Sequence, residues 1–387
     1  MSNYSYSSIK LFIYIRRINF MKKIKFNNSD RKDFMLDLRH SVDNYFTQNK
    51  ISRFGNINMY LKTVFMLSLY CVPYFLMILG YVDPKESSFL FWLLWFLMGF
   101  GMAGIGMSVM HDANHGGYSK NRFVNKILGL TLNFLGGSAK NWRIQHNKLH
   151  HTFTNIHDMD PDVGPVPILR FSPDTPMLKV HKFQHIYAWF FYGLMSLSWA
   201  TIKEFRQTAD FKKRGLINSK EYVSLMAEMI IWKIIYYLYL LVLPMILIPN
   251  LSFGFWFLGF FTMHFVAGFI LGAIFQTAHI MPDCAYPQPD DTGNIETNWI
   301  IHQLQTTSNY APNSKLFSWF VGGLNFQVEH HLFPTICHVH YKNISKIVKA
   351  KAEEYKLPYY SQKNFLKALI EHNKMLYHLG RNKEFSF

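Results

Sequence analysis

Four long apolar stretches constrain the fold of this 387-residue chain more than any other feature of its sequence. They cover about residues 60–82, 89–110, 225–248 and 253–280. As helices, all four are long enough to cross a bilayer, which takes roughly 20 apolar residues. Residues 83–88 alone separate the first two stretches, and residues 249–252 the last two, so each pair must form a hairpin. The sequence therefore predicts an all-α integral membrane protein with four transmembrane helices in two hairpins.

The positions of positive charge predict how the hairpins are oriented. Of the 40 Lys and Arg residues, 11 precede residue 60, 15 lie between residues 111 and 225, and 11 follow residue 280. Because such residues accumulate on the cytoplasmic side, both termini and the central segment are predicted to be cytoplasmic. The net charge of +16 is not accompanied by a nucleic-acid-binding motif. The positive charge therefore predicts binding to an anionic membrane surface or to an acidic redox partner, and not to nucleic acid.

The same patterns divide the chain into three predicted parts. Residues 1–59 form a cytosolic N-terminal segment with a helix over 31–48, residues 60–345 form the membrane core and its cap, and residues 346–387 form a cytosolic helical tail. Two shorter apolar stretches, 123–139 and 187–200, are predicted to be interfacial or re-entrant. The apolar run at residues 11–15 is too short for a secretory signal.

Seven of the 18 histidines fall into three tight groups at residues 111–115, 146–151 and 327–331. On a helix, residues four apart share a face, so His146 and His150 project together while His151 lies on the next face. Neutral imidazole is the usual protein ligand for iron, copper, nickel and zinc. Seven imidazoles are too many for one ion, so the spacing predicts a two-metal centre.

The fourth apolar stretch adds His264 and His279. His279 lies at its cytoplasmic end, at the depth of the first group, whereas His264 is predicted to be a hydrogen-bonded packing residue. The carboxylates predicted to orient ligand rings are Asp112, Glu329 and the run Asp158, Asp160 and Asp162, part of which is expected to be a solvated turn. No catalytic side chain beyond the ligands is predicted. The predicted ligands are His111, His115, His146, His150, His151, His279, His330 and His331, with Gln327 as a weaker oxygen ligand or a donor to the ligands.

A nitrogen-rich site of this kind suits a pair of iron ions that activates dioxygen. The apolar helices below it offer a dry slot for a hydrocarbon chain. Together these features indicate oxidation of an unactivated C–H bond in a lipid.

The three groups and their surroundings resemble the membrane fatty acid desaturases over most of residues 60–345. The matching motifs are His111-Asp-Ala-Asn-His115-Gly-Gly, residues 146–151 followed by Thr152, and Gly322-Gly-Leu-Asn-Phe-Gln-Val-Glu-His-His-Leu-Phe-Pro334. Gln327 in place of a first histidine is similar to the front-end type, the delta-5, delta-6 and linoleoyl-CoA desaturase-like group. Residues 275–279 and Trp299 with His302-Gln303 also resemble that group.

This resemblance implies a four-span core with a cytosolic cap and a diiron centre. It implies that dioxygen and two electrons are used to introduce a cis double bond into a fatty acyl-CoA or acyl-lipid. The ligand set given above is carried over, and His302 and Asn325 are candidates to support the ligands. Many front-end enzymes carry a fused cytochrome b5 domain with a His-Pro-Gly-Gly signature, which this sequence lacks. Electrons are therefore expected from a separate ferredoxin or cytochrome b5-like carrier that docks on the basic face.

Two other interpretations remain open. The first is a lipid hydroxylase or sphingolipid desaturase on the same scaffold, because similar histidine groups serve both outcomes. The second is a histidine-rich membrane transporter or receptor that binds a metal. It is disfavoured because a transporter should place its ligands at mid-membrane depth, where His264 stands alone.

Overall fold

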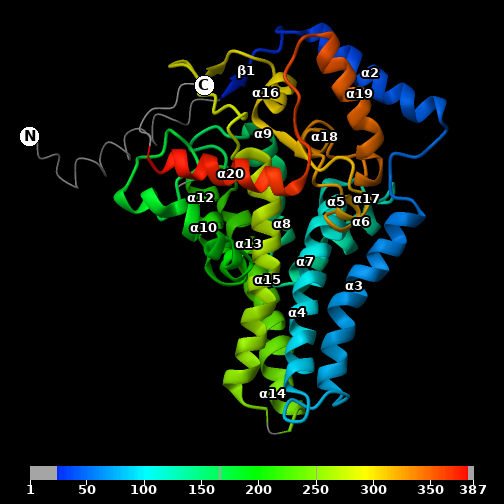
Figure 1. The fold of residues 1–387 in the computed structure, drawn as a ribbon, viewed down its shortest axis with the longest axis vertical. Helices are drawn as coiled ribbons and strands as arrows, with labels where there is room; N and C mark the ends of the chain where they lie inside the picture. The colour runs from blue at the N-terminus through cyan, green and yellow to red at the C-terminus, as the bar shows by residue number, and fades with distance from the viewer. Residues whose placement is uncertain (1–23, 165–166, 250, 382–387) are drawn as a thin grey trace, which may run out of the picture.

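The computed structural model describes residues 24–164, 167–249 and 251–381, and the chain is mostly helical. Four long helices extend from one end of the molecule, and a cap of shorter helices covers the other end (Figure 1). Four helices in this part of the chain are long and apolar enough to cross a membrane: α3 (Ile57–Ile78), the continuous helix α4–η1–α5 (Ser88–His115), α13–η5–α14 (Ser219–Leu247) and α15 (Phe253–His279). The predicted all-α, four-span architecture is confirmed. The run at residues 11–15 lies outside the described residues.

Polar capping residues set the helix boundaries, which the apolar runs place only approximately. Helix α3 begins at Ile57 and not at residue 60, because the Asn56 side chain accepts a hydrogen bond from the Met59 backbone N–H. Helix α13 (Ser219–Tyr237) begins six residues before the predicted span. Asn218 and Glu221 form a reciprocal capping box at that point, which satisfies backbone N–H groups at the helix start.

The second span and the first histidine group belong to one helix. Helix α4 (Ser88–Gly104) continues through η1, a π-helical turn (Ile105–Val109), into α5 (Met110–His115). The helix ends only at Gly116, whose φ of 80° lies in the left-handed region that favours glycine. The predicted end at residue 110 is therefore too early, and His111 and His115 are carried on the span itself.

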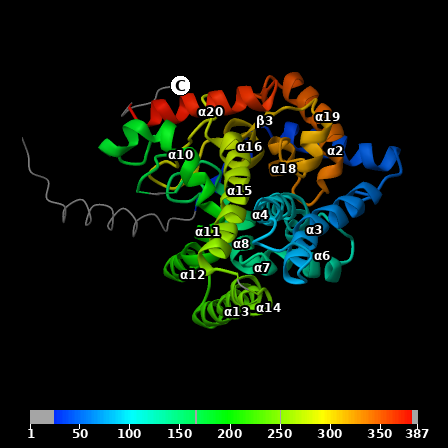
Figure 2. The same ribbon diagram turned by 60° about the horizontal axis from the view of Figure 1, so that its bottom comes forward.

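Small residues allow the central helices to approach closely. A Cβ atom on Gly99 would lie 2.7 Å from a side-chain atom of Val266 on α15, and one on Gly101 would lie 2.6 Å from the backbone nitrogen of Tyr70 on α3. Such contacts are typical of helices packed within a membrane. Figure 2 shows α4 and α15 near the centre of the bundle and α13 at its edge. Helix α13 and its continuation expose a row of apolar side chains, the surface that lipid covers: Ile230, Ile231, Ile234, Ile235 and Leu238.

The cap neutralises Lys233, the buried one of the two lysines in α13. The Lys233 ammonium donates to a Glu204 carboxylate oxygen at 2.9 Å and to the backbone oxygens of Gly136 and Trp199 at 2.8 Å each. The side chains of Lys233 and Glu204 are both only 6% exposed. The ion pair therefore connects α13 to α12 (Glu204–Lys213), and the bond to Gly136 connects α13 to the segment before α8 (Ala139–Trp142).

We expect Lys233→Met to destabilise the protein strongly, because it leaves the Glu204 carboxylate buried without its cation. Breaking a buried pair in this way costs about 3–5 kcal/mol of unfolding free energy. Thermal unfolding of the purified protein in detergent measures the effect. The double variant Lys233→Met with Glu204→Gln should recover much of the loss, and an unchanged unfolding midpoint in the single variant would contradict the assignment.

The cap is built from short helices and two pairs of short parallel strands. Strand β1 (Lys25–Phe26) pairs with β2 (Asn294–Ile295), and β3 (Ser308–Tyr310) pairs with β4 (Tyr360–Gln362). Strands this short leave no alternating pattern, so the sequence does not predict them. The remaining elements are α2 (Lys32–Gln48), α6 (Arg122–Gly129), α7 (Thr131–Phe134), η2 (Arg143–His150), α9 (His151–Phe153), η3 (Lys179–Phe183), α10 (Gln184–Gly193), α11 (Met195–Ser198), η4 (Trp199–Lys203), α16 (Trp299–Thr306), α17 (Lys315–Phe320), α18 (Gln327–Leu332), η6 (His338–His340), α19 (Tyr341–Glu354) and α20 (Phe365–Leu379).

Helix α2 confirms the helix predicted over residues 31–48. The stretches 123–139 and 187–200 form short helices of the cap, and their interfacial placement stays a prediction. Helix α19 runs across residue 345, where the sequence places the start of the C-terminal tail. The division into three parts likewise stays a prediction.

Candidate metal centre

Imidazoles from all three sequence groups and from α15 converge at the capped end of the spans. One ring nitrogen from each of His111, His115, His146 and His330 lies within 4.8 Å of the others, and the same holds for a second set of three rings: His150, His279 and His331. His151 lies between the two sets. Its Nε2 is 3.2 Å from Nε2 of His146 and 3.0 Å from Nε2 of His330. All eight predicted histidines thus form two adjacent clusters, as the sequence predicts.

A π-helical turn produces the contact between His146 and His151. Element η2 spans Arg143–His150, and the hydrogen bonds of a π-helix join residues five apart. His146 and His151 are five apart, and their rings meet edge to face with centroids 4.7 Å apart. His150 turns to the other cluster, 4.8 Å from the His279 ring and 4.9 Å from the His331 ring. Reasoning from the α-helical period misses the His146–His151 contact.

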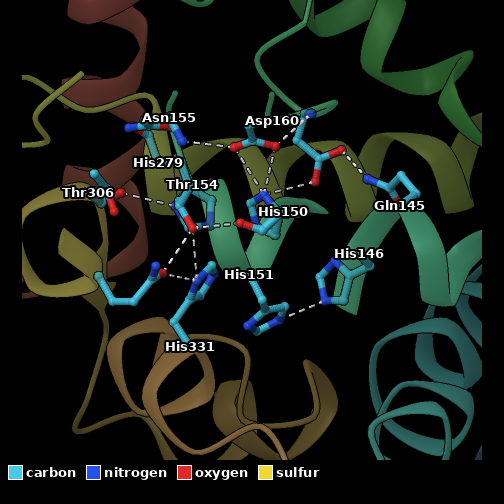
Figure 3. A network of polar contacts seen from close by, with 12 residues as sticks. Gln145, His146, His150, His151, Thr154, Asn155, Asp160, His279, Thr306 and His331 are labelled. Atoms are coloured by element: carbon cyan, nitrogen blue, oxygen red, sulfur yellow. Dashed lines mark hydrogen bonds and ion pairs between the residues drawn. The ribbon is translucent and has the colours of Figure 1, made fainter. Parts of the chain in front are cut away.

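The second cluster is oriented by acceptors behind each ring (Figure 3). The Nδ1–H of His150 donates to the Asp160 carboxylate, with oxygens at 3.0 and 3.1 Å. The Nδ1–H of His279 donates to the Thr306 backbone oxygen at 3.1 Å, and that of His331 to the Gln303 side-chain oxygen at 2.8 Å. With Nδ1 as the donor on all three rings, the neutral form of each ring directs the lone pair of its Nε2 to a metal.

Charge and burial also keep the rings suited to metal binding. Burial lowers the pKa of His146, His151, His330 and His331 well below the usual value, and neighbouring imidazoles lower it further, so these rings are neutral. At His150, burial opposes the charged form, but the carboxylates of Asp160 and Asp162 outweigh it and raise the pKa to about 9. A metal at His150 must therefore displace a proton.

Several ring nitrogens at this place are buried without a hydrogen-bond partner among the described residues. They are Nε2 of His111, His115 and His331 and Nδ1 of His151. Leaving a buried polar atom unpaired costs about 1–3 kcal/mol, so four such atoms in two adjacent clusters need an explanation. Metal ions that accept their lone pairs provide it, and the residues present fit a two-metal centre. The Gln327 amide nitrogen is also buried without a partner, and its role as a ligand stays a prediction.

Comparison with known proteins identifies the scaffold that carries these clusters. The fatty acid desaturase family model matches residues 87–363. An acyl-lipid (8-3)-desaturase of Physcomitrium patens is 34% identical over 362 residues, which are 92% of this chain and 74% of the relative. An sn-1 linoleoyl-lipid 6-desaturase of Synechocystis sp. is 31% identical over 369 residues, which are 93% of this chain and 98% of the relative. The chain belongs to the fatty acid desaturase family.

The resemblance read from the three histidine groups is therefore confirmed. The protein is an integral membrane fatty acid desaturase, an oxidoreductase that introduces a double bond into a fatty acyl chain. A further relative, an sn-1 linoleoyl-lipid 6-desaturase of Arthrospira platensis, is 32% identical over 91% of this chain and 94% of its own length.

The carboxylates near the desaturase's clusters have different roles from one another. Asp160 and Asp162 both approach His150, at 3.0 and 3.5 Å, and the Asp160 side chain is fully buried, so the expected solvated turn does not extend to it. Asp112 accepts a hydrogen bond from Nδ1 of His338 at 2.8 Å. The Glu329 carboxylate bonds to Asn309 and Tyr359 and to none of the ligand rings, so its predicted orienting role is wrong.

Glu329 instead anchors the third histidine group to the C-terminal part of the desaturase. Its carboxylate accepts hydrogen bonds from the Asn309 amide at 2.8 Å and the Tyr359 hydroxyl at 3.0 Å. Burial raises the pKa of Glu329 to about 7, although both hydrogen bonds oppose the shift.

The candidates behind the ligands are partly different from those predicted. His302 donates to the Thr154 backbone oxygen at 2.9 Å and contacts no ligand ring by a hydrogen bond, whereas its neighbour Gln303 does. The Asn325 amide donates to the Tyr310 backbone oxygen at 3.1 Å and thereby holds the loop before α18. His264 is a packing residue, as predicted: it bonds to the Ser196 hydroxyl at 3.0 Å and the Tyr236 hydroxyl at 2.7 Å.

Trp142 is a site residue that the sequence reasoning misses. Its ring stacks on His146 with centroids 4.3 Å apart, and it meets the rings of His111 and His115 edge to face. The available signal is its position four residues before His146, one helical turn away. Trp142 thereby fixes the orientation of the first cluster.

Two cavities lie beside the first cluster. The outer one has a volume of about 370 Å³, lies against His146 and includes the polar side chains of Lys203 and Gln276. The inner one is narrow, with a volume of about 20 Å³, and is lined mainly by apolar residues such as Met102 and Leu271. Both are bordered by the same three aromatic residues: Trp142, Trp199 and Phe275. These three residues therefore lie between the two cavities, both of which are lined mainly by apolar atoms.

Proposed function

We propose that the two clusters hold two iron ions and that the desaturase uses dioxygen and two electrons to form a cis double bond. The convergence of eight imidazoles as two adjacent sets, with unpartnered nitrogens in each, carries this proposal. When bound, the iron pair supplies the activation of dioxygen that attack on an unactivated C–H bond requires. The proposed ligands are His111, His115, His146, His150, His151, His279, His330 and His331, supplemented by Gln327.

The cavities support a path for a single acyl chain. In this proposal the chain enters the outer cavity, passes Trp142 and His146, and ends in the inner cavity. The apolar lining excludes water from the hydrocarbon, while Lys203 and Gln276 remain at the outer cavity for the polar end of the substrate. Removing two vicinal hydrogens with dioxygen, two electrons and two protons yields the double bond and two waters.

The polar end of the proposed substrate is that of a membrane lipid. The relatives from Physcomitrium patens and Synechocystis sp. carry acyl-lipid and linoleoyl-lipid in their names. A lipid already in the bilayer reaches the outer cavity from the membrane, because α10 and α11, which line it, adjoin the middle of α15, one of the spans. We therefore propose an acyl-lipid substrate and treat acyl-CoA as the outcome that would replace it.

The metal centre and both termini are proposed to face the cytoplasm. Where the structure describes them, the basic segments before residue 60, between residues 111 and 225, and after residue 280 belong mainly to the cap, and the two hairpin connections lie at the opposite end (Figure 1). This distribution follows the positive-inside rule. A separate ferredoxin or cytochrome b5-like protein is proposed to supply the electrons from that side.

Expression in a host that lacks polyunsaturated lipids tests the proposed function. With fatty acids supplied, we expect lipids that are two hydrogens lighter than the fed chains, with a double bond located by mass spectrometry. A product heavier by one oxygen would identify a hydroxylase instead. Desaturation of acyl-CoA but not of acyl-lipid by the purified enzyme would overturn the proposed head group.

A further inference from the structure

We propose that α19 is the docking helix for an acidic one-electron carrier protein, and that electrons enter the metal centre beside Tyr341. The proposal rests on the proposed function, which requires two electrons for each double bond. Helix α19 lies in the cap next to α18, which carries the third histidine group, and next to α2 (Figure 1). It is thus placed between the surface and the ligands.

The exposed face of α19 carries a stripe of lysines. Lys342, Lys346 and Lys349 are all exposed and follow the spacing i, i+4, i+7, so they share one face of the helix. The opposite face is buried against the cap: Tyr341, Ile344, Val348 and Ala352. The helix therefore packs against the cap through its apolar side and exposes the ammonium groups of these lysines to solvent.

The nearby carboxylates do not neutralise this stripe. Asp37 and Glu354 both pair with Lys351, at 2.8 and 2.9 Å, on the partly buried side of α19. Glu353 lies 3.8 Å from Lys349, a weak exposed pair. Within the described part of the chain, no carboxylate oxygen lies within 4.0 Å of the ammonium groups of Lys342 and Lys346. Such an uncompensated basic stripe favours and steers an acidic partner.

The first residue of α19 connects this surface to a ligand. Tyr341 is only 1% exposed, and its hydroxyl lies 3.4 Å from Nδ1 of His330. The next residue along the chain, Lys342, is exposed. A carrier bound over Lys342 thus lies beside the residue whose side chain reaches the four-imidazole cluster, and electron tunnelling is faster over a shorter distance through the protein.

The electron balance follows from the overall reaction. For each double bond, two carrier molecules are oxidised by one electron each, and dioxygen is reduced to two waters with the two hydrogens of the substrate and two protons. Tyr341 keeps its hydroxyl proton throughout, because in this proposal the electron only tunnels past its ring.

Charge reversal of the stripe tests the docking site. We compare Lys342→Glu with Lys346→Glu against a matched control, Lys363→Glu with Lys367→Glu, which changes the same charge at two exposed positions also four apart. Each enzyme, reconstituted with iron, is assayed with an acidic ferredoxin and its reductase, and separately in a single turnover after chemical reduction by dithionite. The ratio of the two activities removes differences in folding and iron content.

We expect the α19 pair to raise the KM for ferredoxin about tenfold or more and to weaken its dependence on ionic strength, while the control pair changes neither. Tyr341→Leu should instead lower the rate at saturating ferredoxin and leave that KM unchanged. Equal effects of both lysine pairs, or none from the α19 pair, would overturn the docking site. If the unmodified enzyme forms no double bond after dithionite reduction, the proposed function itself fails.

Discussion

His150→Ala is expected to abolish double-bond formation and to lower the amount of bound iron. The substitution leaves only His279 and His331 in the second cluster, which is too few ligands to retain an ion in a buried site. Elemental analysis of the purified protein gives the iron content, and lipid analysis of expressing cells gives the activity. Retained activity with an unchanged iron content would remove His150 from the ligand set.

Asp160→Asn is expected to weaken iron binding without abolishing it. It keeps His150 but replaces the carboxylate that accepts from Nδ1, the kind of change that typically costs about 10–100-fold in metal affinity. Asp158→Asn is the matched control, because its carboxylate lies 3.7 Å from His157 and contacts no ligand ring. Iron titration should separate the two variants. Equal iron affinities would show that Asp160 does not orient His150.

Gly106→Leu is expected to shorten the acyl chain that the desaturase accepts. Gly106 lines the inner cavity, and a Cβ atom there would meet only Leu271, at ordinary contact distances of 3.5 and 3.9 Å. The backbone thus tolerates a side chain, whose outer carbons must occupy the cavity. Overpacking of this kind costs about 1–3 kcal/mol, which lowers conversion of the longest chains about 10–100-fold while shorter chains still fit.

Feeding fatty acids of graded length to expressing cells measures this shift, with the product yield compared chain by chain. Gly254→Leu is the control, because Gly254 is exposed in the first turn of α15 and a Cβ there would meet nothing within 4 Å. An unchanged length profile in Gly106→Leu would show that the end of the chain does not reach the inner cavity.

The features that the sequence predicts correctly are local ones. The number of consecutive apolar residues gives the length of each span, so the four helices could be predicted. The spacing of the histidines within each group indicates metal ligands, so the convergence of eight imidazoles could be predicted as well. His279 could be assigned because its depth in α15 matches that of His111 in the preceding hairpin. These inferences need no knowledge of tertiary packing.

The features that the sequence does not reveal depend on backbone register and tertiary contacts. The meeting of His146 with His151 requires a π-helical turn, for which the residues of η2 carry no distinctive signal. Glu329 precedes His330 by one residue, and adjacent residues on a helix do not face each other, so proximity in sequence was misleading. Gln303 reaches His331 only because α16 packs against α18.

The unbroken helix from Ser88 to His115 has a consequence for how the enzyme responds to its surroundings. One half of it lies in the bundle of spans, and its last turn holds two of the proposed iron ligands. Spanning helices adjust to a thicker or thinner bilayer by changing their tilt. Because no flexible joint separates the two halves, we expect such a tilt to shift His111 and His115 against the rings held by the cap. Membrane thickness would then tune the geometry of the oxidising site directly.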